Sequence, residues 1–243
     1  MLESGALAAD LDYRVLEYAG DLDQFDLAAR TALCSSPTEM RAYGVFVPPS
    51  QAVLSHARAR AQRPFTPVYA DADARYEAEL ELDVSDLEPQ IALPGGVQNS
   101  VEIARAAGTH IDHVFLGSCG SSMYQDLETA AALLKGRKLA PHVRMFVAPG
   151  SEETTQRMAR EGLLQVFIEA GAVMLPAGCG PCNDAVIGPV HSGEASISTA
   201  ANNNFGRFGP KDAQLYLGSP ATVAASAISG RITDPRSIDA HDH

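Results

Sequence analysis

Short apolar runs alternate with helix-like stretches through the second half of the chain, and this alternation constrains the fold more than any other feature. The runs typical of buried strands are HVFLGSC at 113–119, VRMFVAPG at 143–150, AVMLPAG at 172–178 and AQLYLGS at 213–219. The helix-like stretches are DLETAAALLKG at 126–136, EETTQRMAREGLLQVFIEAG at 152–171 and PATVAASAISG at 220–230. Strands that alternate with helices predict a parallel or mixed sheet covered on both faces.

The first third of the chain has a weaker pattern. It predicts a short strand at 13–18, helical stretches at 22–33 and 51–60, a connecting segment at 63–77 and a strand at 79–89, where ELELDVSDLEP alternates. The predicted fold class is therefore α/β: a three-layer αβα domain with a mostly parallel sheet at 79–236, preceded by a smaller α/β piece with its connecting stretch at 1–78. Residues 237–243 are expected to form a tail.

Composition narrows the class of partner and the compartment. The formal net charge of −12 argues against nucleic acid or an anionic membrane as a main partner. No apolar run reaches the length of a membrane span, and the N-terminus lacks the pattern of a signal peptide. Four cysteines in 243 residues are not a disulfide framework. We therefore expect a reducing, cytoplasmic setting, where clustered cysteines indicate metal or redox chemistry.

Functional sites in open α/β sheets form beyond the carboxyl ends of the strands. Gly117-Ser118-Cys119 ends one predicted strand, Gly150-Ser151 follows another, and Cys179-Gly180-Pro181-Cys182 ends a third. The segment 202–209 follows a further possible strand at 195–200. These four segments are therefore expected to converge at one edge of the sheet.

The cysteines allow several interpretations. Cys119 and the Cys179–Cys182 pair could hold a cubane cluster by three corners and leave one iron open, which suits Lewis-acid chemistry. CGPC is also a redox motif of thioredoxin-like proteins. A zinc site needs a fourth ligand, and the nearest histidine after the pair is His191. Buried inert thiols are the remaining alternative, and for Cys34 a plain core thiol is the better interpretation.

Several collinear segments resemble motifs of the aconitase family. They are GSCGSSMYQDLETAA at 117–131, APGSEETTQRMAREG at 148–162, GCGPC at 178–182, NNNFGRFG at 202–209 and GSPATVAASAISG at 218–230. Upstream, LEYAG at 16–20 and LCSSPTE at 33–39 resemble the end of that family's second domain. The resemblance covers most of residues 12–236 and is nearest to the isopropylmalate dehydratase and homoaconitase group.

The resemblance implies a cofactor, a reaction and a set of site residues. The family binds a [4Fe–4S] cluster through three cysteines and removes and re-adds water on a hydroxy di- or tricarboxylic acid. Carried onto this chain, the cluster ligands are Cys119, Cys179 and Cys182, the catalytic residue is Glu39, and the substrate-binding residues are Arg207, Asn203 and Asn202. Residues 1–78 would then be a partial aconitase-like segment, and residues 79–236 the cluster-binding domain.

Four departures from the family motifs surround these residues. Asn203 stands where the family motif has its first Arg, and a neutral amide cannot replace a guanidinium on a carboxylate. One residue is missing between Phe205 and Gly206. Gly120-Ser121 replaces a Thr-Asn pair, and Ser35 replaces an Asn four residues before Glu39. The cluster thiols are therefore better preserved than the substrate shell.

No part of the sequence matches the family's preceding domain or its small swivelling domain. The resemblance therefore implies a hydro-lyase subunit that needs two partners: a small swivelling-domain subunit and a chain that supplies the first domain. Alone, the chain is expected to be inactive. The alternatives are a non-catalytic iron–sulfur module or degenerate remnant, and a thioredoxin-like redox protein.

Overall fold

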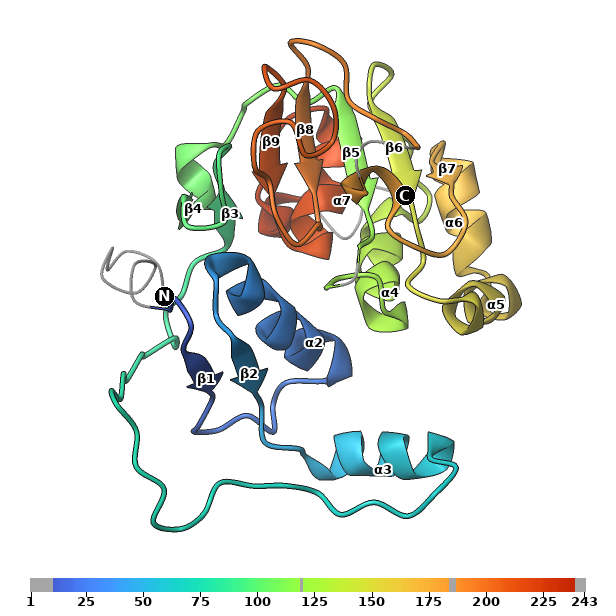
Figure 1. Ribbon diagram of the computed structural model, residues 1–243. Coiled ribbons are helices and arrows are strands. Elements are labelled where there is room, and N and C mark those ends of the chain that lie inside the picture. The colour runs from blue at the N-terminus through green and yellow to red at the C-terminus, as the bar shows by residue number, and fades with distance from the viewer. Residues whose placement is uncertain (1–10, 119, 184–186, 239–243) are drawn as a thin grey trace.

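The computed structural model describes residues 11–118, 120–183 and 187–238 (Figure 1). Its N-terminal part consists of β1 (Val15–Glu17), α2 (Leu27–Ser35), the 3-10 helix η1 (Ser36–Met40), β2 (Gly44–Phe46) and α3 (Gln51–Arg60). Strands β1 and β2 form a two-stranded parallel sheet. The smaller α/β piece expected before the main domain is therefore present.

The remaining elements form a larger α/β unit. They are β3 (Gln90–Ala92), β4 (Ser100–Glu102), η2 (Ile103–Arg105), β5 (His113–Leu116), α4 (Tyr124–Leu134), β6 (Arg144–Val147), α5 (Glu152–Glu161), α6 (Leu163–Ala170), β7 (Val173–Met174), η3 (Gly180–Cys182), β8 (Ala195–Ser198), β9 (Gln214–Leu217), α7 (Pro220–Ser229) and η4 (Pro235–Ser237). No helix in the described ranges is long and apolar enough to cross a membrane.

The seven strands lie in the order β4-β3-β9-β8-β5-β6-β7. The five strands from β9 to β7 run parallel, whereas β3 is antiparallel to both β4 and β9. The predicted α/β fold with a mostly parallel sheet is therefore confirmed. Because parallel strands point the same way, the loops that follow β5, β6, β7, β8 and β9 leave from one edge of the sheet.

The two faces of this sheet are covered differently. Alternate side chains of the central strands, such as Val114 and Ile197, pack on one face against α4, α6 and α7. Phe115 and Leu215 point to the opposite face, where loop residues that include Val190 and Phe208 cover them. Phe115 meets Phe208 edge to face, with 5.9 Å between the ring centroids. Apolar residues on both faces explain why these strands appear in the sequence as continuous apolar runs.

Helix α2 begins later than the pattern of apolar residues predicts. The sequence indicated 22–33, but the first helical residue is Leu27, because the side chain of Asp26 accepts a hydrogen bond from the Ala29 N–H at 2.8 Å and caps the helix. Helix α7 begins as predicted, with Ser219 as its cap, Pro220 in the first turn and Gly230 at its end.

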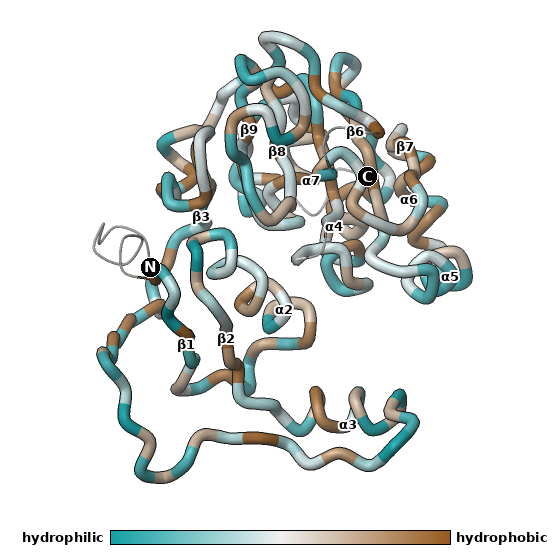
Figure 2. The backbone as a smooth tube through the Cα atoms, viewed as in Figure 1, coloured by the Kyte–Doolittle hydropathy of each residue, from teal (hydrophilic) through white to brown (hydrophobic). Residues whose placement is uncertain are grey.

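The strand predicted at 79–89 is wrong. These residues form no strand, and residues 68–88 are all exposed. Hydrophobic and hydrophilic residues alternate along this extended stretch, which passes beside β1 (Figures 1 and 2). A strand needs a neighbour that pairs with its backbone, and no strand in the described part of the chain pairs with residues 79–88. The unpredicted strands β2, β3 and β4 are each only three residues long.

A buried histidine in β5 makes the fold sensitive to acid. His113 is fully buried, with its Nδ1 2.8 Å from the Ser196 hydroxyl and its Nε2 2.9 Å from the Gly188 carbonyl oxygen. Burial lowers the pKa of the imidazole from 6.5 to about 4; nearby Arg144 also lowers it, and the Gly188 carbonyl opposes the shift. The native protein therefore keeps this side chain neutral where the unfolded chain binds a proton.

We expect the free energy of unfolding to fall as the pH drops from 6.5 to about 4, by about 3 kcal/mol over the whole window. Urea unfolding at several pH values measures this slope, and His113→Gln serves as the control that lacks this part of it. NMR titration should place the His113 pKa near 4. A value at or above 6.5 would contradict the prediction.

Candidate metal centre

The loops that carry the cysteine and asparagine motifs meet at the carboxyl edge of the parallel strands (Figure 1). The loop after β5 begins with Gly117 and Ser118, and η3 in the loop after β7 contains Cys182. The loop after β8 carries Asn202 and Arg207. The predicted convergence of segments at this edge is therefore seen for the described residues. Cys119 lies outside them.

The loop after β5 is held in a tight backbone conformation. Ser118 is buried and has a φ of 84°, a left-handed conformation that is uncommon for a residue other than glycine. The Thr199 hydroxyl at the end of β8 accepts a hydrogen bond from the Gly117 N–H at 2.9 Å and lies 2.9 Å from the Gly117 carbonyl oxygen. The Ser122 hydroxyl donates to the Ser118 carbonyl oxygen at 2.6 Å. Thr199 was not predicted, because a threonine at a strand end carries no distinctive sequence signal.

The two cysteines of the CGPC motif lie on a single turn. Cys182 donates its backbone N–H to the Cys179 carbonyl oxygen at 3.1 Å; the Cys179 side chain is exposed, whereas Cys182 is buried. Gly180 between them has a φ of 53°, and an added Cβ would lie 2.8 Å from the Phe115 ring. This motif forms a three-residue 3-10 turn. The redox motif of the thioredoxin-like interpretation would instead begin an α-helix.

Two donors approach the sulfur of Cys182 from neighbouring loops. The Ser118 hydroxyl and Nη2 of Arg207 each lie 3.7 Å from the Sγ atom. A hydroxyl and a cationic guanidinium both donate hydrogen bonds, so this sulfur is placed as an acceptor, and a deprotonated cysteine sulfur is the form that binds metal. The chemistry of this position therefore fits a metal or cluster ligand. Within the described residues alone, no group of three or more His, Cys, Asp or Glu side chains is placed to hold a metal ion.

Glu39 reaches this edge from the N-terminal part of the chain. It lies in η1, and its Oε2 accepts a hydrogen bond at 2.9 Å from the side-chain amide of Asn202. Asn202 is buried, and its Oδ1 has no hydrogen-bond partner in the part of the chain that the structure describes. Two predicted site residues that are far apart in the sequence thus meet directly.

Asn203 has a different environment. Its side chain is fully buried, and its amide donates to the backbone carbonyl oxygens of Leu93 and Leu215, at 2.7 and 2.9 Å. These bonds tie the loop after β8 to β9 and to the loop after β3. The assignment of Asn203 to substrate binding stays a prediction, and its amide makes a structural contact.

Cys34 lies apart from the CGPC turn, in α2, and it is half-buried. Burial raises the pKa of its thiol, and Arg30 partly opposes this shift. A raised pKa keeps the thiol protonated and unreactive at neutral pH. This environment agrees with the interpretation of Cys34 as a core thiol.

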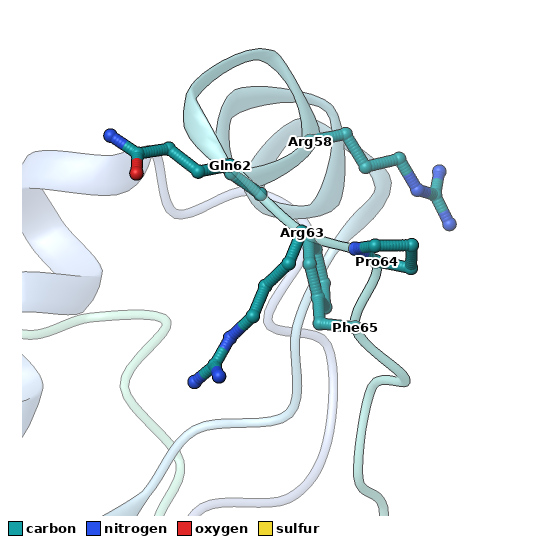
Figure 3. Close-up of a pocket in the computed structure, with 6 residues that line it drawn as sticks. Arg58, Gln62, Arg63, Pro64 and Phe65 are labelled. Atoms are coloured by element: carbon teal, nitrogen blue, oxygen red, sulfur yellow. The ribbon is translucent and has the colours of Figure 1, made fainter.

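A surface hollow of about 400 Å³ lies at the C-terminal end of α3, lined by Arg58, Ala61, Gln62, Arg63, Pro64 and Phe65. Figure 3 shows that the side chains of Arg58 and Arg63 point in different directions. These two guanidinium groups therefore do not converge on one point in the hollow. The loops that follow β5 and β7, which carry the cysteines, remain the better candidate for a functional site.

The chain is similar to one protein-family model and to several curated proteins. Residues 104–230 match the model of the aconitase family (aconitate hydratase). The chain is 43% identical to 3-isopropylmalate dehydratase large subunit 1 of Methanopyrus kandleri, over 96% of this chain and 56% of the relative. It is 41% identical to a probable methanogen homoaconitase large subunit of Methanosarcina mazei, over 95% of this chain and 58% of the relative. The chain thus spans little more than half the length of these curated relatives.

The closely packed glycine of the CGPC turn provides a test of the site geometry. Gly180→Ala should lower the free energy of unfolding by about 1–3 kcal/mol more than Gly193→Ala, because only the first substitution forces a Cβ against Phe115. Both glycines have a positive φ, and Gly193 has nothing within 4 Å of an added Cβ, so it controls for backbone strain. Urea unfolding measures both values. Equal losses would show that the turn does not pack on Phe115.

Proposed function

Because the chain belongs to the aconitase family, we propose that it forms the cluster-binding part of a hydro-lyase large subunit. The proposed substrate is a hydroxy di- or tricarboxylic acid of the isopropylmalate or homocitrate type, the substrate classes in the names of the relatives. The observation that carries the proposal is the environment of Cys182. Two donors from neighbouring loops approach its sulfur, and one of them comes from the residue directly before Cys119.

The proposed cofactor is a [4Fe–4S] cluster held by Cys119, Cys179 and Cys182. Three protein thiolates leave one iron of a cubane free, and an open iron can act as a Lewis acid on a departing hydroxyl group. Support comes from the two donors that approach the sulfur of Cys182 and from the exposed thiol of Cys179 on the same turn.

The protein side chains supply the rest of the proposed chemistry. Arg207, whose guanidinium lies 3.7 Å from the Cys182 sulfur, would bind a carboxylate of a substrate placed at the cluster. Glu39, oriented by Asn202, would exchange a proton with the oxygen that leaves or enters. The base that removes the carbon-bound proton is proposed to lie on a partner polypeptide.

Exposed apolar surface supports the need for a partner. Val15 on β1 and Phe46 on β2 are more than half exposed, although parallel sheets are normally covered on both faces. Leu80, Leu82 and Val84, spaced two residues apart, are exposed in the extended stretch that follows. An ion pair of 2.8 Å between Arg14 and Glu77 holds the beginning of this stretch beside β1. We infer that a partner polypeptide covers this surface and pairs with residues 79–87.

A non-catalytic iron–sulfur module is the second candidate. It is favoured by Asn203, whose amide binds backbone carbonyl oxygens and stands where the family motif has an Arg. A module of this kind would bind the cluster and turn over no hydroxy acid. The two candidates therefore differ in catalysis and share the cluster.

Anaerobic reconstitution tests the cofactor. We expect a brown protein with about four iron and four sulfide per chain, because three thiolates suffice to hold a cubane cluster. Cys182→Ser should lose most of the iron, whereas Cys34→Ser should keep it and serves as the matched control. Iron and sulfide analysis with visible absorbance measures both. Equal iron retention in the two variants would contradict the proposed ligand set.

Catalysis is expected only in an assembled enzyme. Co-expression with a small subunit and with a polypeptide that supplies the remaining large-subunit length should give a complex that dehydrates isopropylmalate or homocitrate, whereas the isolated chain should be inactive. Arg207→Lys should lower kcat/KM by about 10- to 100-fold, because an ammonium group cannot make the bidentate contact. Steady-state kinetics measure this. A cluster-loaded assembly that turns over neither substrate would favour the non-catalytic module.

A further inference from the structure

The N-terminal part and the larger α/β unit meet where the end of α2 and η1 reach the loops that follow β5 and β8. Within residues 11–118, 120–183 and 187–238, Asn202 is the one hydrogen-bond partner of the Glu39 carboxylate. Glu39 is otherwise exposed, and an exposed glutamate samples several rotamers. Asn202 is 5% exposed and sits on a loop anchored by the neighbouring Asn203. A buried donor on a fixed loop therefore holds a flexible acceptor.

A second contact lies four residues earlier in the same segment. An added Cβ on Gly120 would lie 2.5 Å from the Ser35 hydroxyl oxygen and 3.5 Å from its Cβ. The backbone of Gly120 is not left-handed, so the close approach of Ser35, and not the conformation, requires a glycine. The end of α2 thus rests directly on the loop that follows β5.

The second contact joins two of the departures from the family motifs. Ser35 and Gly120 are both smaller than the residues that the family has at these positions, and they touch each other. With Ser35 in its present position, an added Cβ at residue 120 would force the Ser35 hydroxyl to move. A third contact, from the Thr31 hydroxyl to the Met123 sulfur at 3.3 Å, lies on the same interface.

We propose that Asn202 and the Ser35–Gly120 contact are positioning elements that fix η1, and with it Glu39, against the loops that follow β5 and β8. Asn202 holds the carboxylate itself, and Gly120 lets Ser35 approach closely enough to seat the start of η1. The catalytic meaning of this arrangement rests on the proposed function. The contacts themselves are independent of that function. The test therefore uses the isolated chain, without a cluster and without substrate.

Backbone amide exchange reports whether η1 is held. The N–H groups of Arg41 and Ala42 bond to the carbonyl oxygens of Thr38 and Pro37 and exchange when this turn opens. Asn202→Ala should speed their exchange about five- to tenfold, the effect of losing one hydrogen bond. The amide of Phe146 in β6 is the internal control, and its exchange rate should not change. A general loss of stability would instead speed the exchange of Phe146 as well as that of Arg41 and Ala42.

A rescue experiment tests the second contact. Gly120→Ala should speed exchange at Arg41 and Ala42 to a similar degree, and adding Ser35→Ala should restore it, because the remaining Cβ–Cβ distance of 3.5 Å is an ordinary contact. Unchanged exchange in Asn202→Ala, or in Gly120→Ala, would overturn the proposal. Faster exchange throughout the chain, β6 included, without recovery in the double variant would overturn it as well. If the exchange results are as expected but the chain binds no iron, the proposed function is refuted and the positioning proposal stands.

Discussion

The sulfur of Cys182 receives donors from two neighbouring loops, and this meeting point organises the whole edge of the sheet. Ser118 comes from the loop after β5 and Arg207 from the loop after β8, while Cys182 itself follows β7. The parallel strands make the meeting possible, because all of these loops leave from the same edge. Thr199 then fixes the loop after β5 through its contacts with Gly117.

This arrangement separates the cluster-binding part of the site from the part that would act on a substrate. The proposed ligand positions belong to loops of the seven-stranded sheet, whereas Glu39 arrives from the smaller N-terminal part. The hydrogen bond from Asn202 to Glu39 joins the two parts. Under the proposed function, a chain with this division would bind a cluster by itself and would need its interface intact to place Glu39 beside that cluster.

The sequence predicted the elements that are buried and missed contacts between distant residues. Strand β5 and helix α7 were predictable, because one is a continuous apolar run and the other has a capping serine, a proline and a final glycine. The alternation at 79–89 predicted a strand that has no neighbour in the described part of the chain, since pairing depends on partners and not on the pattern alone. The contact of Asn202 with Glu39 spans 163 positions and leaves no local signal.

The central claim is that three thiolates from two loops hold one cluster at the carboxyl edge of the sheet. Anomalous diffraction at the iron edge, from crystals of the anaerobically reconstituted chain, tests it most directly. The account predicts a compact group of iron atoms. Each of the sulfurs of Cys119, Cys179 and Cys182 should lie within bonding distance, about 2.3 Å, of one iron, and one further iron should have no protein thiolate. Iron bound elsewhere, or held without the sulfur of Cys119, would contradict it.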